Sequence, residues 1–225
     1  MPGRIIPLIT GQFYHVYNRG INKQPIFRSI GDYQRALELI RFYQYSALHL
    51  RYSKYQLLSN QRKQDFWQQL FNRPKLSSII SFCFMPNHFH LLLEQKMDNG
   101  ISKFIGNFQN SYTLFFNKKY KCSGPLLQGQ FKALRIEDEN QFLHLHRYIH
   151  LNPYSSYVVK NLSDISNYRW SSFSEYLEKD NSIICSKEKI LSYFKNIETY
   201  KSFILDQADY QRKLEVIKHL ILEET

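Results

Sequence analysis

Short stretches of this chain carry apolar residues in the pattern of β-strands. Residues 12–17 form a β-favouring run that ends at a turn signal, Asn-Arg-Gly, at 18–20. Residues 76–84 form a longer apolar run, and a Met-Pro-Asn turn at 85–87 separates them from a second β-prone run at 88–94. The two central runs therefore predict a β-hairpin.

Other stretches repeat apolar residues with the spacing of an α-helix. The clearest helix is predicted over 101–120, where lysines follow in the last turn and favour the helix dipole. Asp32 is expected to cap an earlier helix that ends near Tyr45. A later helix over about 139–151 is expected to close at Asn152-Pro153, because a proline disfavours helical backbone in the residue before it.

The remaining segments complete the order of elements. Residues 47–75 are polar and predict an exposed elaboration with a helix near 61–70, and residues 130–136 predict a short strand. After Trp170 the pattern is helical, and helices are expected over 186–194, 199–205 and 209–222.

The order is strand, helix, hairpin, helix, strand, helix. It predicts an α+β fold, a ferredoxin-like antiparallel sheet with helices on one face, plus a C-terminal helical extension. We expect a first domain over residues 1–175 and the helical extension over 176–225.

Composition adds a strong charge to this picture. The 225 residues carry a formal net charge of +11, which favours a polyanionic partner such as nucleic acid. A solvated basic surface without a partner is the alternative. No apolar run approaches the roughly 20 residues that span a bilayer, and we see no signal peptide.

The three cysteines are Cys83, Cys122 and Cys185. Their wide spacing and odd number favour neither a disulfide framework nor a zinc knuckle. We interpret them as small buried side chains and expect a reducing, cytoplasmic location.

Two imidazoles in the predicted hairpin suggest metal chemistry. His88 and His90 are two apart on a strand, so both project to one face and provide half of a metal site. Histidine also departs from the β-propensity of the strand, as residues at functional sites often do. On the later helix, Tyr148 and Asn152 are four apart and share a face, which offers a nucleophile and a further metal ligand.

The same helix offers a competing pattern. His146 and His150 have the spacing of a zinc metalloprotease helix, and His144 adds a third imidazole. However, Arg147 follows His146 where such an enzyme carries its glutamate base. We therefore interpret these histidines as DNA-facing or helix-packing residues.

Five segments together resemble one known family, and they span roughly the first 175 residues in the right order. They are Phe13-Tyr14-His15-Val16-Tyr17-Asn18-Arg19-Gly20, Met85-Pro86-Asn87-His88-Phe89-His90-Leu91-Leu92-Leu93, Leu127-Gln128-Gly129-Gln130-Phe131-Lys132-Ala133, Arg147-Tyr148-Ile149-His150-Leu151-Asn152-Pro153 and Trp170-Ser171-Ser172-Phe173. The chain resembles the REP-associated tyrosine transposases, within the single-tyrosine, HUH-type transposase superfamily. It departs from the family pattern at Gln130, where the family usually shows arginine, and residues 47–75 form a longer segment than the family leads us to expect.

The resemblance implies a role for each residue of the site. His88 and His90 would bind a divalent metal with Asn152 as third protein ligand, and Tyr148 would be the nucleophile. Tyrosine has an unperturbed pKa of about 10, so the metal and nearby cations must help to activate it. An uncharged set of imidazoles and an amide suggests Mg²⁺ or Mn²⁺, with phosphate and water completing the shell.

The implied activity is metal-dependent DNA transposition. The enzyme would bind single-stranded DNA next to hairpins, and would cleave and rejoin it through a 5′-phosphotyrosine intermediate, as a monomer or homodimer. The alternatives are a non-catalytic, domesticated hairpin-binding regulator and a rolling-circle initiator or relaxase-like nicking enzyme. The residues predicted to contact phosphates or unpaired bases are Arg19, Lys103, Lys118, Lys119, Lys121, Lys132, Tyr17 and Tyr120.

Overall fold

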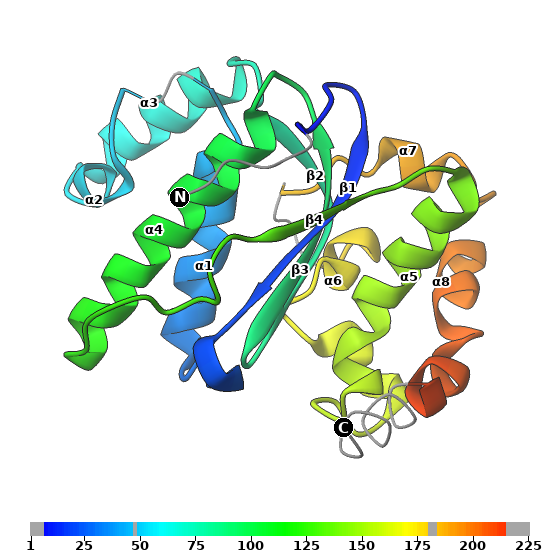
Figure 1. The fold of residues 1–225 in the computed structure, drawn as a ribbon. Helices are drawn as coiled ribbons and strands as arrows, with labels where there is room; N and C mark the ends of the chain where they lie inside the picture. The colour runs from blue at the N-terminus through cyan, green and yellow to red at the C-terminus, as the bar shows by residue number, and fades with distance from the viewer. Residues whose placement is uncertain (1–6, 47–48, 180–183, 215–225) are drawn as a thin grey trace.

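The computed structural model describes residues 7–46, 49–179 and 184–214. Its helices and strands follow the predicted order (Figure 1). In chain order they are β1 (Phe13–Arg19), η1 (Ile21–Lys23), α1 (Ile30–Tyr43), α2 (Tyr52–Tyr55), α3 (Asn60–Phe71), β2 (Ser77–Met85), β3 (His88–Gln95), α4 (Gly100–Tyr120), β4 (Lys132–Arg135), α5 (Glu139–Ser155), η2 (Leu162–Asn167), α6 (Phe173–Tyr176), α7 (Glu188–Leu191) and α8 (Ile197–Leu205).

The four strands form one antiparallel sheet in the order β2-β3-β1-β4. The two halves, β1-α1-β2 and β3-α4-β4, interleave, so that β3 lies between β1 and β2 and β1 lies between β3 and β4. This is the ferredoxin-like arrangement of an α+β fold. The predicted fold class is confirmed.

Helices cover both faces of the sheet, whereas the sequence predicted helices on one face only. Helices α1 and α4 lie on one side, and α5, α6 and α8 lie on the other (Figure 1). The physical reason lies in two neighbouring strands: every residue of β2 is buried, and so are most residues of β3. A strand that is apolar on both faces needs a layer on each side to exclude water.

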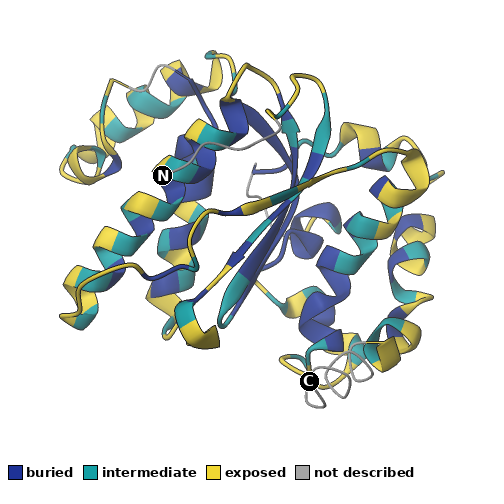
Figure 2. Cartoon of the chain, in the orientation of Figure 1, coloured by how far each residue is buried: buried dark blue, intermediate teal, exposed yellow. Residues whose placement is uncertain are grey.

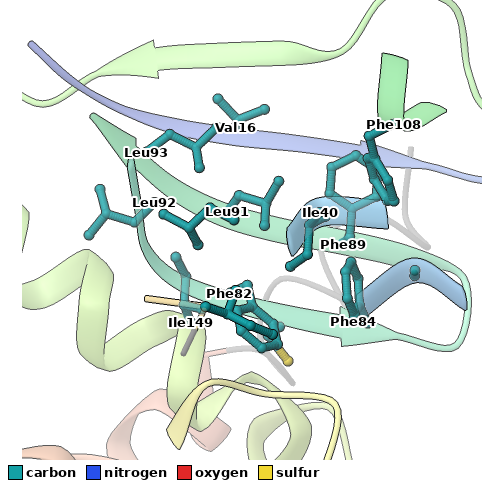
Figure 3. Packing of buried hydrophobic residues seen from close by; sticks show 14 of the residues in the cluster. Val16, Ile40, Phe82, Phe84, Phe89, Leu91, Leu92, Leu93, Phe108 and Ile149 are labelled. Atoms are coloured by element: carbon teal, nitrogen blue, oxygen red, sulfur yellow. The ribbon is translucent and has the colours of Figure 1, made fainter. Parts of the chain in front are cut away.

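The core follows from this layering (Figures 2 and 3). Phe89 of β3 packs edge-to-face on Phe108 of α4, with ring centroids 5.4 Å apart. Leu92, the third residue after Phe89, points to the opposite side, where Ile149 of α5 lies (Figure 3). The sheet thus packs against an apolar layer of helix side chains on each of its two faces.

Two predicted helix ends are corrected. Ser29, not Asp32, caps α1; Asp32 occupies the third helical position and its Oδ2 accepts the backbone N–H of Ser29, completing a capping box. Helix α5 does not close at Asn152-Pro153 but continues to Ser155. A proline near a helix end removes one hydrogen bond, and the Ser156 N–H still bonds the Asn152 carbonyl at 3.0 Å.

Other boundaries are shorter than predicted. Strand β4 covers only Lys132–Arg135, and α7 covers only Glu188–Leu191 of the helix expected over 186–194. The helix over 60–71 in the polar elaboration and the helix over 197–205 are present as expected. The helix expected over 209–222 lies partly outside the described residues.

All three cysteines are free thiols. Cys83 and Cys185 are buried, as interpreted from the sequence, but Cys122 is exposed just after α4, so that interpretation is wrong for Cys122. None of the described helices combines the length and the apolar character needed to cross a bilayer. The division of the chain at 175/176 stays a prediction.

Candidate active site

The face of the sheet toward α5 carries the two histidines singled out in the sequence. His88 and His90 alternate with Phe89 along β3, and therefore share a face. In the neighbouring strand β1, Tyr17 pairs with His90 and Arg19 pairs with His88. Directly paired residues point to the same side of a sheet, so these four side chains form one surface.

A third histidine, which the sequence reasoning did not select, belongs to this surface. His15 precedes Tyr17 by two positions, and its Nε2 lies 2.9 Å from Nδ1 of His90 in a hydrogen bond. The pKa of the His15 imidazole falls to about 4, because the surrounding protein displaces the water that would solvate its charged form. The alternation His15-Tyr17-Arg19 is the signal that would have found it.

Tyr148 projects from α5 onto the same surface. Its ring centroid lies 5.6 Å from that of His90 and 6.4 Å from that of His15, both in edge-to-face geometry. His88 adjoins this cluster through His90, with ring centroids 4.9 Å apart. The structure therefore brings the predicted nucleophile and the predicted histidines together within a single molecule.

Asn152 follows Tyr148 by one helical turn. Because α5 remains helical through Pro153, Tyr148 and Asn152 do share a face. The side chain of Asn152 is buried, and its Oδ1 accepts a hydrogen bond from the Ser156 hydroxyl at 3.4 Å. One acceptor bond of this length leaves the amide oxygen lone-pair capacity for a ligand.

The donor set fits a divalent metal in its chemistry. Nδ1 of His88 bonds Oδ1 of Asn87 at 2.6 Å, and Nδ1 of His90 bonds His15. A hydrogen bond at one ring nitrogen orients the other nitrogen toward a metal, as in most histidine ligands. Within the described part of the chain, no three His, Cys, Asp or Glu side chains are grouped for a metal. The third protein donor that the resemblance implies is an amide, that of Asn152.

Three of the predicted DNA contacts border this site. Tyr17 lies beside His15 and His90, with ring centroids 4.8 and 5.8 Å away. Lys132 of β4 pairs with Tyr17, and its Nζ lies 6.0 Å from the centre of the tyrosine ring. Arg19 is exposed, and its Nε donates to Oε1 of Gln128 at 2.6 Å.

The other predicted contacts lie on α4 or directly after it, on the opposite side of the sheet (Figure 1). Lys119 is engaged within the protein, because its Nζ lies 2.6 Å from Oδ1 of Asp32. Tyr120 donates its hydroxyl to the same carboxylate and packs on Phe116, with ring centroids 4.6 Å apart. These contacts give both residues a structural role, while Lys103, Lys118 and Lys121 are exposed.

Lys118 borders a cavity of about 980 Å³ between α1, α2 and α4. The wall also carries Arg35 and Arg51 and the aromatic rings of Tyr43, Tyr52 and Phe115, and none of the described residues that line it is a carboxylate. The polar elaboration, together with α1 and α4, thus forms a second basic, aromatic surface on the side of the sheet away from Tyr148.

The zinc-like histidine pattern on α5 has a packing role. His146 and His150 are fully buried, and the Tyr200 hydroxyl of α8 lies 3.0 Å from Nε2 of the first and 3.0 Å from Nδ1 of the second. His150 also bonds the Ser172 hydroxyl at 2.8 Å. Burial lowers the pKa of His146 to about 3 and that of His150 well below its usual value. His144 is exposed on the other side of the helix.

Two comparisons with known proteins return matches. A solved structure described as "Structure of the REP associates tyrosine transposase bound to a REP hairpin" is similar, with 16% sequence identity, a TM-score of 0.49, and coverage of 82% of this chain and 89% of that chain. No curated protein sequence gives a significant match.

A family comparison locates the relationship within the chain. The family described as "Transposase IS200 like" matches residues 43–152. The matched segment contains His88, His90, Tyr148 and Asn152. The resemblance found in the sequence is confirmed at this level: residues 43–152 of this chain are similar to the IS200-like transposases.

Proposed function

We propose that this protein is a metal-dependent, single-tyrosine transposase that cleaves and rejoins single-stranded DNA. The observation that carries the proposal is the position of Tyr148, whose ring lies 5.6 Å from that of His90 in the same molecule. The family match supports a transposase-type function acting on DNA, and the arrangement of the site supports the finer chemistry.

In the proposed reaction, the phenol oxygen of Tyr148 attacks a backbone phosphorus. A bond forms between that oxygen and phosphorus, and the bond from phosphorus to the 3′ oxygen breaks. The phenol proton passes to water, and the departing 3′ oxygen takes up a proton from water and becomes a hydroxyl. The product is a 5′-phosphotyrosine, which conserves the linkage so that another 3′ hydroxyl can later reverse the reaction.

The residues around Tyr148 would divide the remaining tasks. His88, His90 and Asn152 would hold Mg²⁺ or Mn²⁺, which when bound offsets the negative charge that develops on the phosphate. Arg19 and Lys132 would hold the DNA backbone beside the histidines, because cations position phosphates without reading sequence. Tyr17, next to His90, would stack on an unpaired base.

The proposed substrate is single-stranded DNA next to a hairpin. This substrate class follows from the five segments that resemble REP-associated tyrosine transposases, and the net charge of +11 supports a polyanionic partner. The chain would act in the cytoplasm as a monomer or homodimer.

The test is a search for the covalent intermediate. End-labelled single strands that carry a library of hairpins are incubated with the protein and Mn²⁺ or Mg²⁺, and adducts that resist SDS are detected on a gel. We expect an adduct with the wild type that disappears with Tyr148→Phe and with EDTA. Tyr157→Phe, which alters an exposed tyrosine after the same helix, is the matched control and should retain the adduct.

The result also separates the alternative function. A non-catalytic hairpin-binding regulator would bind the oligonucleotides but form no adduct across the library. An adduct that survives Tyr148→Phe would contradict the assignment of the nucleophile.

A further inference from the structure

His15 and His90 come from strands 75 positions apart and meet through their ring nitrogens. Nε2 of His15 lies 2.9 Å from Nδ1 of His90, and the two rings are stacked at 5.1 Å with an angle of 26°. His15 also lies edge-to-face with Tyr148 at 6.4 Å. One imidazole of β1 therefore contacts both a predicted metal ligand and the predicted nucleophile.

The direction of this hydrogen bond decides whether Nε2 of His90 can bind a metal. A neutral imidazole carries one proton, so one ring nitrogen donates and the other accepts or binds a metal. When His90 donates from Nδ1, its Nε2 keeps the lone pair that a metal requires. When His15 donates instead, the His90 proton sits on Nε2 and blocks that nitrogen as a ligand.

The hydrogen bond of His88 indicates which of the two directions applies at His90. Nδ2 of Asn87 donates to the Lys23 carbonyl at 3.1 Å, which turns Oδ1 of Asn87 toward His88. Since Oδ1 only accepts, His88 must donate from Nδ1. The same assignment at His90 gives the two histidines a common tautomer, with both Nε2 atoms as ligand nitrogens on one face of β3.

We propose that His15 is a positioning residue that accepts the Nδ1 proton of His90 and so sets the Nε2 atom of His90 as a metal ligand. The inference rests on the metal site of the proposed function. It adds a residue of β1, outside the family match of 43–152, to the residues on which the site depends.

The hydrogen bond is tested first in the protein without metal or DNA. Long-range ¹H–¹⁵N spectra of the imidazoles above neutral pH distinguish a proton on Nδ1 from one on Nε2. We expect His90 to carry its proton on Nδ1 in the wild type and to lose this preference in His15→Phe, which keeps an aromatic ring beside Tyr17. A wild-type His90 that carries its proton on Nε2 overturns the proposal.

The consequence for the ligand is tested by Mn²⁺ binding, followed by electron paramagnetic resonance or calorimetry without DNA. His15→Phe should lower the affinity for Mn²⁺ by roughly 10- to 100-fold, the usual cost of removing a partner that orients a ligand. His15→Gln, whose amide oxygen can accept the same proton, should restore most of the affinity. His144→Phe, at an exposed histidine of α5, should bind Mn²⁺ like the wild type.

The two variants of His15 also distinguish a role in orienting His90 from a role in packing alone. Equal Mn²⁺ affinity in His15→Phe and the wild type overturns the proposal, as does a loss in His15→Gln as large as that in His15→Phe. These readouts are independent of Tyr148, so an absent DNA adduct with the expected tautomer and Mn²⁺ affinities contradicts the proposed reaction and leaves the role of His15 intact.

Discussion

Arg19 is the cation that stands across from His88 in the sheet, and it is exposed beside the proposed site. Its guanidinium is held by Gln128, from the segment just before β4, so the side chain is oriented before any DNA arrives. At the residue scale, a fixed cation beside the proposed metal site is suited to hold a phosphate next to the one that would react.

Replacing Arg19 with alanine should therefore weaken binding of hairpin-bearing single strands through the loss of one phosphate contact. The dependence of log affinity on log salt should become shallower by roughly 0.7, the contribution of one contact to a single strand. Fluorescence anisotropy over a salt series measures both quantities. Arg135→Ala is the control, because Arg135 pairs with Tyr14 and so projects to the opposite face of the sheet; an equal effect of both variants would contradict a local contact.

At the scale of elements, α5 is held from two sides. The sheet lies under Tyr148, while Tyr200 of α8 joins His146 and His150 on the other side of the helix. The segment after α8 adds a bond from Nε2 of Gln211 to the Tyr148 carbonyl at 3.2 Å. The C-terminal helices thus fix the helix that carries the predicted nucleophile.

Tyr200→Phe should destabilise the fold, because it leaves two buried imidazoles without their shared hydroxyl. The expected cost is about 1–3 kcal/mol, the usual penalty for an unsatisfied buried polar group. Urea unfolding followed by circular dichroism measures it. Tyr210→Phe removes the hydroxyl of an exposed tyrosine in the same region and should change stability little; similar losses in both variants would argue against the network.

The buried histidines also predict how stability changes with pH. The folded-state pKa values of His146, His150 and His15 lie below the unfolded value of about 6.5. As pH falls below about 6.5, the unfolded chain takes up protons that the folded chain does not, so the free energy of unfolding decreases toward about pH 3. Above about pH 6.5 the three histidines make their full contribution to the free energy of unfolding.

Urea midpoints at about pH 7.5 and about pH 5.5 check this expectation, with a lower midpoint at the acid value. Glu175 has the opposite effect, because burial raises the pKa of its carboxyl group. Its contribution to the free energy of unfolding therefore increases as pH falls. His144→Ala should keep the same pH dependence, since His144 is exposed. A midpoint that is constant or rises on acidification would contradict the dominance of the buried imidazoles.

At the scale of the whole molecule, the sheet separates two basic surfaces. One surrounds Tyr148, and the other is the cavity beside α4 that Lys118 and Arg51 border. A short DNA strand bound at Tyr148 would not reach the cavity on the other side of the sheet, so only a longer substrate would contact both surfaces.

Lys118→Glu should therefore weaken binding of long, hairpin-bearing oligonucleotides, and leave adduct formation with a short single strand unchanged. The two substrates are compared by anisotropy and by the SDS-resistant adduct. Lys201→Glu, at an exposed position of α8, is the matched change in charge. If both variants weaken binding equally, the net charge of the protein and not this surface explains the effect.

The elements that carry the site were predictable because their signals are local. Alternation in β3 places His88 and His90 on one face, and the spacing of α5 does the same for Tyr148 and Asn152. The hairpin, α4 and the α+β class follow from patterns that need no long-range contact. The helix ends were less predictable: Ser29 and Asp32 both suit a helix start, and only the backbone geometry chooses between them.

The sequence by itself determined which residues have the chemistry for metal binding and nucleophilic attack, and on which faces of their own elements they lie. Only the tertiary structure decided which of those faces meet. His15 reaches His90 because β1 pairs with β3 in one register, and His146 and His150 are neutral packing residues because α8 covers them. Strand register and helix docking depend on contacts between residues far apart in the chain, which no local pattern encodes.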